Sequence, residues 1–135
     1  MSFQRRIGAH EVIVDDDDIL TVVFRGQLGA QDMREILIEH DGKLNRDGDL
    51  FSISDMRRVG AVEPGARHAL GARSRNLPGY CVAYMVSSFQ MKLLMEVLLR
   101  AANLRLKGKV VYRFFDSEGP AREWLLEMRR NRQTK

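Results

Sequence analysis

The side chains that could do chemistry are spread over this sequence and do not form a known catalytic pattern. The three histidines, His10, His40 and His68, lie in separate segments, and none has a cysteine or carboxylate at metal-site spacing. The signatures of serine hydrolases, phosphate-binding loops, dinucleotide sites and zinc proteases are missing from the sequence. His40 falls on the apolar stripe of a predicted helix with no acid on that face, so we expect a hydrogen-bonded packing residue. These features predict a protein that is not an enzyme and that uses no metal ion and no cofactor.

The single cysteine, Cys81, cannot form an intrachain disulfide. Its apolar neighbours are typical of a buried strand, where a free cysteine packs as a small apolar residue. The sequence has no N-terminal apolar run of the signal-peptide kind and no apolar stretch of bilayer length. We therefore expect a cytoplasmic protein with no integral membrane association.

The formal net charge of +4 is unevenly distributed. Residues 1–49 carry 6 basic and 11 acidic side chains and residues 50–128 carry 12 and 7, so these two parts cancel and the whole excess lies after residue 128. Such polarity favours oriented or self-complementary association over general phosphate binding. Segment 57–75 holds five arginines against one acid, but no aromatic residue is interleaved for base stacking. We expect a solvated basic face and no nucleic-acid partner.

Hydrophobic periodicity predicts the elements that must position these residues. The acidic run 15–18 is typical of a hairpin turn, and the later strands alternate with helices, which predicts a parallel sheet. The fold class is α/β, with a five-stranded, mostly parallel sheet, an antiparallel N-terminal edge hairpin, four helices and the order β-β-α-β-α-β-α-β-α. One domain is expected over residues 1–130, followed by a disordered basic tail at 131–135. The predicted strands are 10–14, 19–26, 50–56, 80–86 and 110–115, and the predicted helices are 29–45, 63–76, 89–106 and a last one after Asp116.

Three stretches resemble a known family. They are residues 19–26, residues 50–57 with Asp55, and residues 113–118 with the following Ala121 and Trp124. Together with the element order, they are similar to the SpoIIAA-like fold of STAS (anti-sigma-factor antagonist) domains, in the bacterial branch grouped with CRAL-TRIO lipid-transfer domains. The resemblance implies a regulatory module that binds other proteins. Members that act as phospho-switches carry a serine shortly after the third strand, whereas residues 55–65 here contain no serine or threonine, so the resemblance implies the scaffold without that switch.

A ligand site is predicted where the parallel strands end, because ligands of open α/β sheets bind outside the carboxyl ends of the strands. Arginines there, beside serines that cap the next helix, could hold an anion. The alternative is that Asp55 pairs with an arginine and the serines only cap. The predicted strand-end rim comprises Asp55, Arg57, Arg58, Ser87, Ser88, Gln90, Asp116 and Ser117.

The predicted helix 89–106 is apolar on most sides, with one narrow polar stripe of Lys92, Glu96, Arg100 and Asn103. A helix that covers a sheet needs a narrower apolar face, so this helix must bury a second side. That side could meet extra core, a second subunit or an apolar ligand. The sequence thus predicts a non-catalytic STAS-like interaction module that forms a homodimer, and the alternative is a carrier or sensor of a lipid-like or other apolar small molecule. The residues predicted for the interface or pocket are Met91, Leu94, Met95, Leu98 and Leu99.

Overall fold

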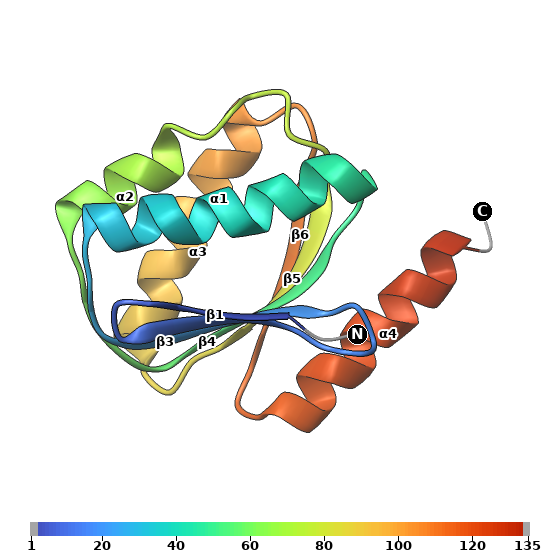
Figure 1. Cartoon of the computed structure of the whole chain (residues 1–135), viewed down its shortest axis with the longest axis horizontal. Coiled ribbons are helices and arrows are strands. Elements are labelled where there is room, and N and C mark those ends of the chain that lie inside the picture. The colour runs from blue at the N-terminus through green and yellow to red at the C-terminus, as the bar shows by residue number, and fades with distance from the viewer. Residues whose placement is uncertain (1–2, 134–135) are drawn as a thin grey trace.

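The computed structural model of the protein describes residues 3–133, which form six strands and four helices. All six strands belong to one sheet and lie in it in chain order. The pairs β1–β2 and β2–β3 are antiparallel, and the pairs from β3 to β6 are parallel (Figure 1). The elements are β1 (Phe3–Ile7), β2 (His10–Val14), β3 (Leu20–Leu28), α1 (Ala30–Asp47), β4 (Phe51–Val62), α2 (Pro64–Gly71), β5 (Tyr80–Met85), α3 (Phe89–Arg105), β6 (Val110–Phe115) and α4 (Glu118–Gln133).

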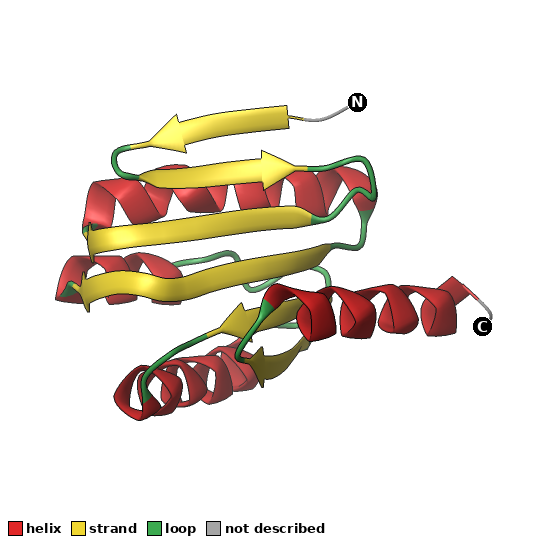
Figure 2. Ribbon diagram, turned by 90° about the horizontal axis from the view of Figure 1, so that it is seen from below, coloured by secondary structure: helices red, strands yellow, loops and turns green. Residues whose placement is uncertain are grey.

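Helices cover both faces of the sheet. Helices α1, α2 and α3 lie on one face and α4 lies alone on the other (Figures 1 and 2). The strand β5 is buried along its whole length between these layers, as a central parallel strand should be. Its alternate residues feed two separate cores: Val82 packs under the three helices, and Ala83 packs under α4.

The predicted α/β class, the four helices and the mixed sheet are confirmed, but the sheet has six strands, not five. The additional strand β1 pairs with β2, so residues 10–14 do not form the sheet edge. The strand β1 was not predicted because the adjacent charged residues Arg5 and Arg6 interrupt the alternation of apolar and polar residues that is typical of a strand. Arg5 lies on the sheet face that α1 covers, where its guanidinium binds the carboxylates of Glu35 and Glu39 on α1 at 3.0 and 2.6 Å.

The strand β4 is longer than predicted, since it continues past Asp55 to Val62. Its far half stays paired with β3 up to the pair Leu28–Val62, with register shifts on the way. Gly60 allows this close pairing, because a side-chain carbon there would lie 3.2 Å from the carbonyl carbon of Gly26. The helix predicted over 63–76 is shorter and ends at Gly71.

The helix α4 also corrects the predicted tail. It continues to Gln133, so residues 131–133 are helical rather than disordered, while residues 134–135 lie outside the described part of the chain. Arg132 holds this last turn in place. Its guanidinium carbon lies 5.3 Å from the ring centroid of Phe51, and it pairs with the carboxylate of Asp49.

Candidate functional site

The predicted strand-end rim lies only partly at strand ends, because Asp55 lies within β4 while β5 and β6 end level with it. Asp55 is in register with Met85 at the end of β5, which is in register with Phe115 at the end of β6. Arg57 closes on Asp55 with two side-chain bonds, Nε to Oδ1 and Nη2 to Oδ2, both 3.0 Å. Burial raises the pKa of Asp55, but the Arg57 hydrogen bonds outweigh it, so the pKa lies below its ordinary value. Asp55 and Arg57 therefore neutralise each other.

The other rim residues are used locally or point to solvent. Ser88 caps α3, because its hydroxyl accepts the Met91 N–H at 3.0 Å. Ser87 donates to the Arg57 carbonyl at 3.3 Å, which links the start of α3 to β4. The remaining rim residues, Arg58, Gln90, Asp116 and Ser117, are exposed. The geometry thus gathers Asp55, Arg57 and Ser87, and it agrees with the alternative of ion pairing and capping.

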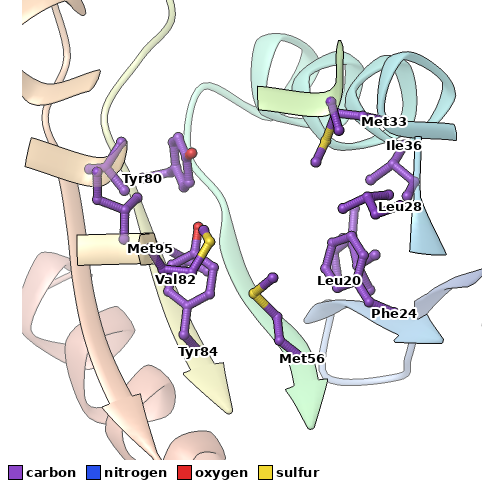
Figure 3. Close-up of a cluster of buried hydrophobic side chains, with 14 of the residues drawn as sticks. Leu20, Phe24, Leu28, Met33, Ile36, Met56, Tyr80, Val82, Tyr84 and Met95 are labelled. Atoms are coloured by element: carbon purple, nitrogen blue, oxygen red, sulfur yellow. The ribbon is translucent and has the colours of Figure 1, made fainter. Parts of the chain in front are cut away.

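An interior cavity of about 50 Å³ lies between the sheet and the three helices. Figure 3 shows Met56 between two groups of side chains, with Tyr80, Val82, Tyr84 and Met95 on one side and Leu28, Met33 and Ile36 on the other. The polar lining of the cavity comes from His40, Ser54, Arg73, Tyr80 and Tyr84. Its volume would hold a few water molecules.

Beside this cavity, Ser52, His40 and Asp41 are hydrogen-bonded in the order used by serine hydrolases. The Ser52 hydroxyl lies 3.4 Å from His40 Nε2, and His40 Nδ1 lies 2.8 Å from an Asp41 carboxylate oxygen. Ser52, however, is only 1% exposed and does not line the cavity. Its hydroxyl also lies 3.5 Å from the Cys81 carbonyl. Substrate cannot reach this serine, so the arrangement connects α1 to the sheet rather than forming a nucleophile.

Asp41 is held on its other side by Arg73. The guanidinium of Arg73 donates to both Asp41 oxygens, at 2.9 and 2.5 Å, and to the Tyr80 hydroxyl at 2.8 Å. Burial lowers the pKa of His40, and the opposing influence of Asp41 is too weak to reverse it. Burial raises the pKa of Asp41, but the bonds from His40 and Arg73 prevail and lower it. The group is therefore a neutral imidazole, a carboxylate and a guanidinium with every charge paired.

This network corrects the expectation that His40 has no partner acid. Asp41 was not recognised because adjacent helical residues normally face different directions. The pairing depends on the Arg73 side chain, which comes from the segment after α2 and is 7% exposed. No spacing rule in the sequence connects positions 41 and 73.

The helix α3 leaves one apolar face uncovered. Phe89, Leu93, Val97 and Leu104 are 69%, 47%, 65% and 88% exposed, and they follow one another at helical spacing. The five residues predicted for the interface or pocket lie elsewhere: Met95 and Leu99 are buried in the core, and Met91, Leu94 and Leu98 pack against it. The predicted second apolar side exists, but the prediction chose the side that covers the sheet.

The described residues contain neither a metal-ligand cluster nor a helix suited to a bilayer. Within residues 3–133, no group of three or more histidine, cysteine, aspartate or glutamate side chains could hold a metal ion. No helix in the same range is both long and apolar enough to cross a bilayer.

Comparison with known proteins gives a match to a solved structure. No protein-family model and no curated protein matches the chain. The solved structure of an uncharacterized DUF3478-family protein from Shewanella loihica PV-4, described as having a SpoIIAA-like fold, superposes with a TM-score of 0.54. The match covers 93% of this chain and 92% of that chain, at 20% sequence identity. The chain has a SpoIIAA-like fold.

Within the SpoIIAA-like fold, the described residues offer three surfaces for function. They are the strand-end rim, the apolar face of α3 and a basic cleft between α2 and α3. The rim side chains are engaged with one another, whereas the α3 face has nothing packed over it. We define the α3 face by Phe89, Leu93, Val97 and Leu104.

Proposed function

We propose that this SpoIIAA-like domain is a non-catalytic regulatory module that works through protein contacts, and that it self-associates through the α3 face. The observation that carries the proposal is the exposure of four large apolar side chains along one side of α3. Contiguous exposed apolar surface is typical of interaction sites, because burying it against a partner removes it from water.

The spacing on α3 fits a second copy of the chain. Val97 has Leu93 four residues before it and Ala101 four residues after it, and Ala101 is also exposed. In an antiparallel two-fold pair centred on Val97, Leu93 of each copy would lie opposite Ala101 of the other. A large side chain would thus meet a small one on both sides of the axis, as a self-complementary interface requires.

The charges beside the α3 face fit the same arrangement. Glu96 lies at the edge of the face, and Arg100 lies about one turn later on α3, between Val97 and Leu104. With Val97 on the axis, Glu96 of one copy and Arg100 of the other are ~3 Å apart along the helix direction, at 1.5 Å per residue. The pair would form twice, which favours this orientation over a parallel one.

The interior cavity favours this function over the carrier alternative. A volume of about 50 Å³ has no room for an acyl chain unless the helices separate from the sheet. Of the five predicted pocket residues, only Met95 lines it. A carrier role would therefore require a different conformation of α1, α2 and α3.

Sedimentation equilibrium over a range of protein concentrations tests the self-association. We expect a reversible dimer that Val97→Asp converts to a monomer, while Ile38→Asp, at an equally exposed apolar position on α1, leaves it intact. Glu96→Arg and Arg100→Glu should each weaken the dimer, and the double exchange should restore it. A wild-type chain that stays monomeric at all concentrations would refute the second-copy partner.

A further inference from the structure

A cleft of about 200 Å³ lies between α2 and α3. Its α2 wall is formed by Arg67, Leu70 and Gly71, and its α3 wall by Leu98, Ala101, Ala102 and Arg105. These residues recur at three- and four-residue spacing, so each helix contributes one face. Because the middle of the cleft is built from glycine and alanine, the helices leave a hollow there.

The cleft concentrates positive charge. Four arginines are among its described lining residues, Arg67, Arg73, Arg75 and Arg105, and no acidic residue is among them. Arg73 is already paired with Asp41. Within residues 3–133, the other three make no ion pair with a carboxylate.

Two of these arginines are positioned by backbone carbonyls, which fix a guanidinium without cancelling its charge. Arg67 Nε donates to the Val62 carbonyl at 3.1 Å, and Arg105 donates to the Gly71 carbonyl. A side-chain carbon at Gly71 would lie 3.1 Å from Arg105 Nη1, so the glycine allows this arginine to lie over the end of α2. The remaining N–H groups of both guanidinium ions are available to a ligand.

We infer that the cleft binds the phosphate monoester of a small organic molecule. Guanidinium groups are suited to phosphate oxygens, since their planar donors form paired, charge-assisted hydrogen bonds. Three unpaired guanidinium groups match a phosphate monoester, which carries about −1.5 to −2 charge at neutral pH, better than a carboxylate, which carries a single negative charge. The apolar part of the ligand lies against Leu98 and Ala101. This inference does not rest on the proposed self-association, although Ala101 lines the cleft and also lies in the proposed dimer contact.

Phenyl phosphate serves as the probe. Inorganic phosphate and phenol, which correspond to its two halves, are the comparison ligands. In a titration followed by backbone amide NMR, we expect phenyl phosphate to saturate, to shift the amides of α2 and the last turns of α3, and to bind more tightly than either half. Arg75→Gln and Arg105→Gln should each weaken binding at least about tenfold, as loss of a charge-assisted hydrogen bond implies. Arg130→Gln, an exposed arginine on α4, is the matched control.

Three results would overturn the inference. They are shifts that map away from the cleft, binding that is unchanged in Arg75→Gln and Arg105→Gln, and inorganic phosphate binding as tightly as the ester. Amide spectra of the unliganded variants separate a local loss of binding from misfolding. If phenyl phosphate binds as expected while sedimentation shows only monomer, the proposed self-association is refuted and the proposed ligand site in the cleft is supported.

Discussion

Asn103 on α3 holds Val110 on β6 by both of its backbone groups. The Asn103 amide donates from Nδ2 to the Val110 carbonyl at 3.0 Å, and its Oδ1 accepts the Val110 N–H at 2.7 Å. Backbone N–H groups of β5 and the residue after it donate to the carbonyls of Lys109 and Phe115. Backbone groups alternate in direction along a strand, so those of Val110 point away from β5. Asn103 thus replaces a neighbouring strand at the start of this sheet edge.

Replacing Asn103 by leucine should expose this edge. The variant keeps the side-chain size but loses both hydrogen bonds, so the free energy of unfolding should fall by ~1–3 kcal/mol in urea denaturation. Hydrogen exchange of the Val110 amide should accelerate. Asn45→Leu, on the exposed side of α1, is the control and should change neither quantity. Unchanged Val110 exchange in the Asn103 variant would contradict the assignment.

Arg73 should be the most sensitive charged residue. Arg73→Met leaves the Asp41 carboxylate half-buried without its partner, and loss of one member of a buried pair costs ~3–5 kcal/mol of unfolding free energy. Arg73→Lys keeps the charge but cannot donate to both Asp41 oxygens and to Tyr80, so it should be destabilised as well. Thermal unfolding measures both variants, and Arg75→Lys, at an exposed position two residues on, should match the wild type.

Stability should decrease as the pH falls below about 6.5, the ordinary pKa of histidine. Burial lowers the pKa of His40 in the folded state, so the unfolded chain binds this proton first and acid favours unfolding. At still lower pH, the lowered pKa of Asp41 adds to the loss. Urea denaturation at a series of pH values measures this slope.

His40→Gln should flatten the part of that slope near pH 6 while lowering stability at neutral pH. His68→Gln is the control, because His68 is exposed on α2. An identical slope in the His40 variant and the wild type would assign the dependence to another group.

The adjacent serines at the start of α3 should differ in their contribution. Ser88→Ala removes the hydroxyl that caps α3 and should lower the unfolding free energy by ~1 kcal/mol. Ser87→Ala removes an exposed 3.3 Å bond to the Arg57 carbonyl and should cost less. Chemical denaturation of both single variants compares them directly, and equal losses would contradict this ranking.

Local patterns predicted most of the fold. The turn at residues 15–18 joins two antiparallel strands. The residues of α1 that share the helical spacing of His40, namely Met33, Ile36 and Leu44, are buried. The strand β6 has the predicted bounds, and the helices α1 and α3 differ from prediction by a few residues at most. These elements were predictable because their apolar periodicity is a property of neighbouring residues alone.

The misses have different causes. The strand β1 was missed because Arg5 lies on the covered face, where Glu35 and Glu39 on α1 accept its charge. The extension of β4 was missed because Arg57 and Arg58 resemble a loop, although Arg58 is in register with Arg25 on β3. In both cases a polar residue is tolerated in a strand by a partner that is distant in sequence.

By itself, the sequence determined the α/β alternation, the four helices and the surplus apolar surface of the third one. Only the tertiary structure decided which side of α3 is surplus. The helix is apolar nearly all round, so periodicity could not rank its faces, and the sheet selected Met95 and Leu99 as core and left Val97 in solvent. The same holds for the His40–Asp41–Arg73 network and for the basic cleft between α2 and α3. Each exists because chain folding brings distant side chains together, and such contacts produce no periodic pattern in the sequence.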